Sequence, residues 1–144
     1  MYCNDTARYL VALTTLMILP ILEIKNSSKR GRGVFANDNI KQDTVIEISP
    51  VIVLTEKERK IVEKTILFDY IFEWGINKKR ACVAMGYVSM YNHNYDANCE
   101  YEMDFKKRLM TIKTVKPIKR GEELFVNYNA SPNDKTRVWF DKGK

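Results

Sequence analysis

The stretch Met90-Tyr91-Asn92-His93-Asn94-Tyr95-Asp96-Ala97-Asn98 gathers more hydrogen-bonding side chains than any other part of the chain, and it contains the only histidine. It follows the mostly apolar run 81–88, which predicts a buried strand. Asparagine and aspartate side chains compete with the backbone for hydrogen bonds, so they favour irregular loops over helix interiors. A polar surface loop between two strands is the simplest interpretation of this stretch.

Two further stretches change that interpretation. Gly121-Glu122-Glu123-Leu124-Phe125-Val126-Asn127-Tyr128-Asn129 predicts a turn and then an alternating strand that ends on a tyrosine. Arg30-Gly31-Arg32-Gly33-Val34-Phe35-Ala36 places two glycines where the backbone could approach a ligand closely. Together with Asn92-His93 and Asn98, these segments resemble, in the same order, the signature motifs of SET-domain lysine methyltransferases. The resemblance covers roughly residues 21–140.

The resemblance implies a mostly β fold of the β-clip type, with a few short helices and a threaded, knot-like C-terminal segment. It also implies three regions. An N-terminal extension covers residues 1–20, the SET domain covers 21–130 with a short insert at about 55–80, and an aromatic tail covers 131–144. Because the resemblance begins only near residue 21, Met17 is a candidate for the natural first residue.

Local patterns predict most of the individual elements. Thr55 followed by Glu56 and Glu58 predicts a helix to about Lys64, since threonine caps a helix and acidic residues suit its first turn. The apolar run 9–22 is too short for a membrane span and contains a proline, so it predicts a packed helix leading into the first strand. Alternating or β-branched runs predict strands over residues 22–25, 34–36, 45–48, 50–54, 67–74, 81–87, 100–105, 108–114 and 124–128.

Composition bounds the functional classes. The 144 residues suffice for one domain, and the net charge of +6 is scattered along the chain. The triplets 78–80 and 106–108 are basic but fall at expected turns, so we interpret them as solvated turns and do not expect direct nucleic-acid binding. The three cysteines are far apart and form no Cys-x-x-Cys pair, which predicts neither a disulfide framework nor a metal site. A reducing setting follows: cytoplasmic for a bacterial protein, or the host nucleus for a viral or secreted one.

The resemblance implies transfer of methyl groups from S-adenosylmethionine to a lysine of a protein, such as a histone or another basic protein. Tyr128 matches the catalytic tyrosine of the family. The small Val126 then predicts room for di- or trimethylation. The implied cofactor-binding residues are Arg30, Gly31, Arg32, Gly33, Tyr70, Asn92, His93, Tyr128 and Trp139, and the implied substrate channel is formed by Tyr87, Val126 and Phe140.

The chain departs from the family pattern at Val88, Asn94 and Ala97, where many relatives carry Gly, Ser and Pro. Two alternatives therefore stay open. One is a catalytically silent SET domain that binds a peptide or partner, and the other is a basic β domain that binds nucleic acid without catalysis. A homodimer is a further expectation, because minimal members of the family can pair to complete their channels.

Overall fold

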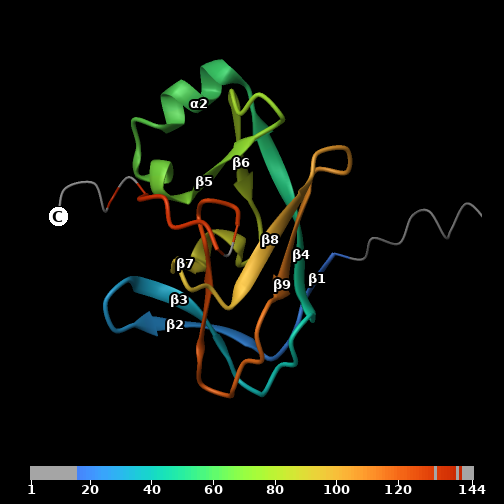
Figure 1. The fold of residues 1–144 in the computed structure, drawn as a ribbon. Coiled ribbons are helices and arrows are strands. Elements are labelled where there is room, and N and C mark those ends of the chain that lie inside the picture. Colours follow the sequence, from blue (N-terminus) through green and yellow to red (C-terminus); the bar gives the residue numbers. More distant parts are fainter. Residues whose placement is uncertain (1–15, 132, 139, 141–144) are drawn as a thin grey trace, which may run out of the picture.

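Short strands form two sheets in the part of the chain that this computed structural model describes, residues 16–131, 133–138 and 140 (Figure 1). The larger sheet has the order β5-β6-β4-β9-β8, and β1 also pairs with β4. The smaller sheet has the order β2-β3-β10-β7. The strands are β1 (Met17–Ile18), β2 (Leu22–Ser27), β3 (Gly31–Ala36), β4 (Val45–Leu54), β5 (Ile71–Trp74), β6 (Arg80–Ala84), β7 (Asn92–His93), β8 (Cys99–Asp104), β9 (Leu109–Thr114) and β10 (Glu123–Val126).

The predicted insert contains helix α2 (Glu56–Val62), at the top of Figure 1. Its predicted cap is confirmed, because Thr55 and Glu58 form a reciprocal capping box. The strand predicted over residues 67–74 is only half correct. Residues Ile66–Tyr70 form a 3-10 helix, since the Thr65 side chain accepts a hydrogen bond from the Leu67 amide and starts a turn there.

Two other boundaries differ from the prediction. The strand predicted over 81–87 ends at Ala84, because Gly86 has a φ of +68° and turns the chain into a 3-10 helix at Val88–Met90. The helix predicted over 9–22 lies partly outside the described residues. Within them, Met17–Ile18 is a strand that pairs with Glu47 and Ile48. No helix in the described stretches is both long and apolar enough to cross a bilayer.

Strand β10 lies between two strands that are distant in sequence. It pairs antiparallel with β3, through Leu124 and Val34, and parallel with β7, through Val126 and His93. The Asn98 side chain locks this arrangement. Its Nδ2 donates to the Glu123 carbonyl at 2.9 Å, and its Oδ1 accepts from the Phe125 amide at 2.8 Å. The two sequence motifs therefore lie side by side, while a knot-like crossing of the chain stays a prediction.

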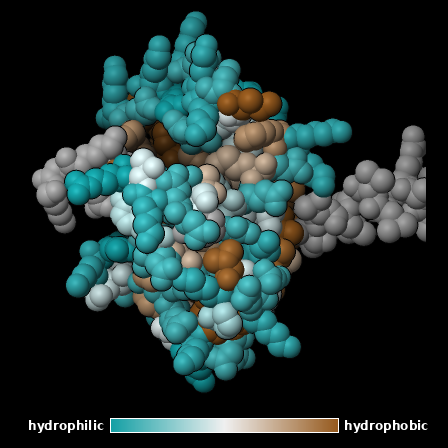
Figure 2. Space-filling model, viewed as in Figure 1, coloured by the Kyte–Doolittle hydropathy of each residue, from teal (hydrophilic) through white to brown (hydrophobic). Residues whose placement is uncertain are grey.

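The larger sheet curls so that its two outer strands, β5 and β8, face each other. Phe72 packs edge-on against Tyr101 with ring centroids 5.6 Å apart, and Trp74 packs against Phe105 at 4.9 Å. The two sheets share one apolar core, which contains the fully buried Val34, Ile46, Trp74, Met110, Ile112 and Leu124. In Figure 2, apolar residues also gather in a band across the upper third of the visible face.

We predict that Asn98→Ala destabilises the protein by about 1–3 kcal/mol, because it leaves a backbone carbonyl and a backbone amide of β10 without their partner. Urea unfolding measures the loss. Asn39→Ala is the matched control, since Asn39 accepts one exposed bond from the Arg120 amide and its loss should cost less than about 1 kcal/mol. Equal stabilities of the two variants would contradict the role assigned to Asn98.

Candidate functional site

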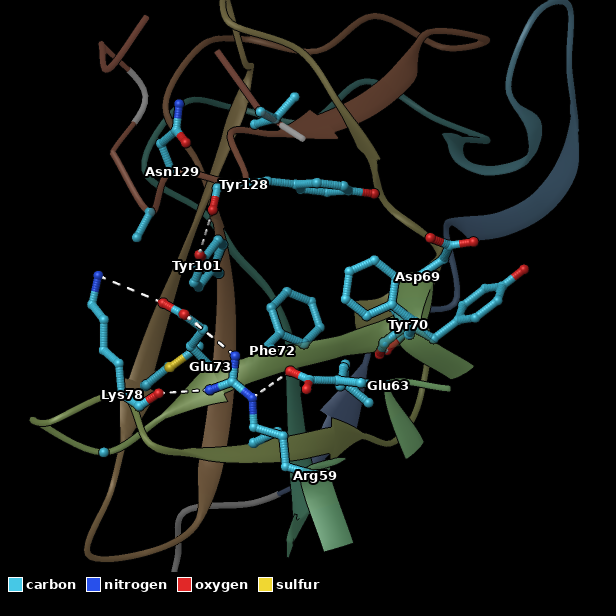
Figure 3. Close-up of a pocket in the computed structure, with 18 of the residues that line it drawn as sticks. Arg59, Glu63, Asp69, Tyr70, Phe72, Glu73, Lys78, Tyr101, Tyr128 and Asn129 are labelled. Atoms are coloured by element: carbon cyan, nitrogen blue, oxygen red, sulfur yellow. Dashed lines mark hydrogen bonds and ion pairs between the residues drawn. The ribbon is translucent and has the colours of Figure 1, made fainter. Parts of the chain in front are cut away.

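Two cavities meet at Tyr128. The larger has a volume of about 810 Å³ and the smaller about 350 Å³, and both fall in the range of small-molecule sites. Tyr128 lines both of them, as do Asp69, Tyr70 and Ser89. Figure 3 shows the Tyr128 ring pointing toward Asp69 and Tyr70. These four shared residues therefore mark the place where the two cavities adjoin.

Cationic and backbone groups dominate the smaller cavity. Arg30, Gly31 and Arg32 line it from the turn between β2 and β3 and the start of β3. The Arg30 guanidinium donates to the His93 carbonyl and lies 5.4 Å from the centre of the Phe125 ring. Two arginines in a pocket of this size favour an anionic group, such as a carboxylate.

Beneath this cavity, Gly33 allows a close approach of three chain segments. A Cβ atom there would overlap the Glu123 carboxylate and the Asn92 amide. In the space that glycine leaves, Asn92 Nδ2 donates to Glu123 Oε1 at 2.7 Å and to the Arg32 carbonyl at 3.2 Å. Ser27 Oγ donates to the other oxygen of Glu123 at 2.8 Å. This network fixes the floor of the smaller cavity.

Tyr128 is held at three points. Its amide donates to His93 Nδ1 at 3.1 Å, its hydroxyl donates to the Tyr91 carbonyl at 3.0 Å, and its carbonyl accepts from the Tyr101 hydroxyl at 3.4 Å. Burial raises the pKa of Tyr128 to about 12, so the phenol is neutral at physiological pH. A neutral phenol donates one hydrogen bond and offers oxygen lone pairs as acceptors, which is the chemistry that this junction presents.

A buried carboxylate fixes the segment that carries the Tyr91 carbonyl. Glu47 is fully buried and accepts from the Ser49 hydroxyl and the Tyr87 amide, both at 2.7 Å, and from the Tyr91 hydroxyl at 3.0 Å. Gly86 must be glycine here, because a Cβ atom would overlap Ser49 and Glu47. Burial raises the pKa of Glu47, and the hydrogen bonds oppose that rise. Glu47 thus positions Tyr128 indirectly, through Tyr91.

The larger cavity lies between the outer strands β5 and β8, with residues 128–130, 134 and 136–138 along its side. Apolar and aromatic side chains, including Phe72 and Tyr101, form its middle (Figure 3). At one end Arg59 pairs with Glu63 at 2.6 Å and with Glu73 at 3.5 Å. Its lining carries five acidic residues (Glu63, Asp69, Glu73, Glu102 and Asp134) against three basic ones (Arg59, Lys78 and Arg137), although the chain as a whole is basic.

Most of the residues predicted for a cofactor gather at the smaller cavity. Arg30, Gly31, Arg32, Tyr70, Asn92 and Tyr128 line it. Gly33 lies beneath it, and His93 packs behind Tyr128 with ring centroids 5.2 Å apart. Trp139 lies outside the described residues.

None of the three residues predicted for a substrate channel lines the larger cavity. Tyr87 and Val126 line neither cavity: Tyr87 packs against the core and Val126 is only 1% exposed. The structure therefore gives Val126 no direct contact with either cavity. Phe140 lines the smaller cavity, not the larger one.

The sequence interpretation missed Asp69, Ser89 and Glu47. Ser89 Oγ donates to the Tyr70 carbonyl at 2.9 Å and so ties the insert to the junction. Neither Asp69 nor Ser89 belongs to the three motifs, and only the fold brings them together. Glu47 had a signal, since a lone acid inside the apolar run 45–54 marks a buried, partnered carboxylate. In the described stretches, no group of three His, Cys, Asp or Glu side chains could hold a metal ion.

Comparisons with known proteins agree with this arrangement. The SET domain family model matches residues 31–129. A curated relative from Schizosaccharomyces pombe, named "Histone-lysine N-methyltransferase, H3 lysine-37 specific", is 33% identical over 121 residues, which are 83% of this chain and 77% of the relative. The "Histone-lysine N-methyltransferase SETD7" of Halocynthia roretzi is 26% identical over 123 residues, which are 74% of this chain and 31% of that protein.

Solved structures share the fold. A crystal structure of a candidate histone methyltransferase from Plasmodium falciparum superposes with a TM-score of 0.60 at 25% identity, covering 85% of this chain and 99% of that one. An apo ctPRC2 structure with two mutations in Ezh2 gives a TM-score of 0.61 at 21% identity, covering 78% of this chain and 15% of that one. The second likeness shows the fold alone.

We predict a pH signature for Glu47. Since its pKa is raised above 4.5 in the folded protein, the folded state binds this proton more tightly than the unfolded chain does. The stability of the wild type relative to Glu47→Gln should therefore fall as the pH rises from about 4.5 through the raised pKa, and should be constant above it. Urea midpoints between pH 4 and pH 8 measure the difference.

Ser49→Ala is the control for this prediction. It keeps the carboxylate and removes a donor that lowers the pKa of Glu47. The fall in stability with rising pH should therefore be larger in Ser49→Ala than in wild type. A stability difference between wild type and Glu47→Gln that does not change with pH would show that folding does not raise the pKa of Glu47.

Proposed function

The chain belongs to the SET domain family and is a protein-lysine methyltransferase, and we propose that it binds S-adenosylmethionine in the smaller cavity and the substrate lysine in the larger one. The observation that carries this proposal is the position of Tyr128, which lines both cavities where they meet. Methyl transfer requires donor and acceptor on opposite sides of one narrow junction, in line with each other.

The residues of the smaller cavity fit the cofactor by their chemistry. Arg30 and Arg32 suit the carboxylate of its methionine part. Gly31 has no side chain, and no other group lies within 4 Å of the place where its Cβ atom would be, so a ligand can approach the backbone there. Phe140 offers an aromatic face for the adenine. When bound, the cofactor supplies a methyl group activated by its attachment to a sulfonium.

The chain's own residues then hold and align the reactants. Tyr128 stays neutral, and its hydroxyl is oriented by the Tyr91 carbonyl, so its oxygen is fixed at the junction. Asp69 lies on the same wall and attracts the substrate ammonium toward the junction. Beyond it, Phe72 and Tyr101 remove water from around the lysine, which favours the neutral amine that can attack.

A basic protein, such as a histone, is the substrate class that the larger cavity supports best. Its lining has more acidic than basic residues within a chain of net charge +6, which favours positively charged residues on either side of the target lysine. The names of the two curated relatives also specify histone lysine. Pairing of two copies and the cellular compartment stay predictions.

Tyr128→Phe tests the proposal. The variant should still bind S-adenosylmethionine within about threefold of wild type in calorimetry, because its ring stays in place, but its methyl transfer to a mixture of histones should fall at least a hundredfold. Tyr101→Phe is the matched control. It removes a hydroxyl that donates a long hydrogen bond of 3.4 Å to the Tyr128 carbonyl, so it should keep most of the activity.

Two outcomes would contradict the proposal. Wild-type protein that binds the cofactor yet methylates no lysine in any basic protein would favour the silent, peptide-binding alternative. Full activity of Tyr128→Phe would show that the junction of the two cavities is not the reaction centre.

A further inference from the structure

The fold brings together two basic segments that are separate in the sequence, Lys78-Lys79-Arg80 and Lys106-Lys107-Arg108. The first follows β5 and the second follows β8. Phe72 packs on Tyr101, and further along both strands Trp74 packs on Phe105. Because the contacts occur in the same order, β5 and β8 run in the same direction and their following turns lie at the same end of the molecule. In Figure 1 both turns are at the upper right.

We call these six residues the basic end. All six are exposed. Lys78 approaches Glu73, and Lys107 approaches Asp104, each at a long 3.8 Å. Within the described residues, the other four form no salt bridge within 4.0 Å; they are Lys79, Arg80, Lys106 and Arg108. The basic end therefore carries a surplus of positive charge on its surface.

Both turns of the basic end are held in fixed conformations. Lys78 and Arg108 have φ values of 54° and 55°, in the left-handed region. The Arg59 guanidinium donates to the carbonyls of Lys78, at 2.6 Å, and Arg80, at 3.2 Å. In the other turn, the Lys107 amide donates to Asp104 Oδ1 at 2.8 Å. The charges thus project from an ordered surface, which lowers the entropy lost on binding.

The basic end adjoins the larger cavity. Gly75 and Lys78 from the first turn line that cavity, as does Phe105 at the start of the second. The molecule therefore offers a groove whose lining has more acidic than basic residues and, next to it, a cationic surface. A target that matches both the groove and the cationic surface is a basic protein segment that extends from a polyanion.

We propose that the basic end binds the phosphate backbone of duplex DNA, so that the enzyme acts on a basic tail of a DNA-bound protein. This reverses the expectation from the sequence, where each basic triplet taken alone is interpreted as a solvated turn, because the fold places the two triplets at the same end of the molecule. The action on a basic tail rests on the proposed function, whereas the DNA contact does not. Duplex DNA fits better than a single strand, because the exposed side chains here are mostly lysine and arginine, and the nearest aromatic, Phe105, is packed edge-on against Trp74. Lysine side chains that contact phosphates bind DNA without distinguishing its base sequence.

The test is anisotropy of a fluorescently labelled DNA duplex of about 25 base pairs, titrated with the full chain at several salt concentrations. Wild type should bind with Kd of about 1–100 μM, weakening as salt rises. The variant Lys79→Glu/Lys106→Glu/Lys107→Glu should bind at least tenfold more weakly, with a shallower salt dependence.

The matched control is Lys41→Glu/Lys119→Glu/Arg120→Glu, which changes the net charge equally. These exposed residues flank the bridge between Ile40 and Ile118, in turns at the bottom of Figure 1. The control should lose less than about threefold in DNA affinity, and circular dichroism should show both variants folded. An equal loss in the two variants would overturn the proposal, as would no wild-type binding at 50 mM salt.

Two further readouts separate the partners. Polyglutamate of matched charge should compete weakly with DNA; equal competition would assign the surface to acidic proteins and overturn the proposal. On a histone peptide, the basic-end variant should keep wild-type methylation, while on the same histone wrapped in DNA it should lose at least fivefold. If wild type binds DNA but methylates neither substrate, the proposed function fails and the DNA contact stands.

Discussion

The structure depends on β10 being held between β3 and β7. A four-residue strand with one parallel and one antiparallel neighbour has little pairing energy of its own, and Asn98 adds two side-chain bonds to its backbone at the point where it enters. Everything at the junction follows from this register. Val126 opposite His93 places Tyr128, two residues on, against the His93 ring and below the Tyr91 carbonyl.

Hydrogen bonds of buried polar groups hold the segments around Tyr128 in place. An unpaired carboxylate in the core is costly, but Glu47 is surrounded by donors from Ser49, Tyr87 and Tyr91 and so becomes an anchor for the segment 86–91. Glu123 and Asn92 form a second anchor above Gly33. The first network holds Tyr91, whose carbonyl accepts a hydrogen bond from the Tyr128 hydroxyl. The second holds Asn92, the neighbour of His93, which accepts a hydrogen bond from the Tyr128 amide. The two carboxylates thus position the tyrosine through other residues.

The sequence predicted features that depend on local chemistry. The Thr55 cap and the two strands β8 and β9 with the turn between them have short-range signals, and the structure bears them out. It did not predict which side of β10 faces a cavity, and Val126 and Tyr87, which were assigned to a substrate channel, line neither of the two cavities. Strand alternation fixes two faces but does not say which one is covered by a distant segment. Asp69 and Ser89 were missed for the same reason, because the wall they share exists only after the insert folds over the sheet.

The curl of the larger sheet links the larger cavity to the surface charge. If β5 and β8 lay flat at opposite edges of a sheet, the aromatic pairs between them could not form, and the turns that follow them would be separated by the width of the three strands between. Closing the curl creates an enclosed space between the two strands and, by the same movement, brings six cations to its end. The acidic residues of the cavity are spread over β5, β8, the segments that follow α2 and the C-terminal segment, and Arg59 and Arg137 lie among them, whereas the surplus of positive charge lies on the turns after β5 and β8. This arrangement gives a bound basic segment a direction, with its own charges in the groove and any attached polyanion at the basic end.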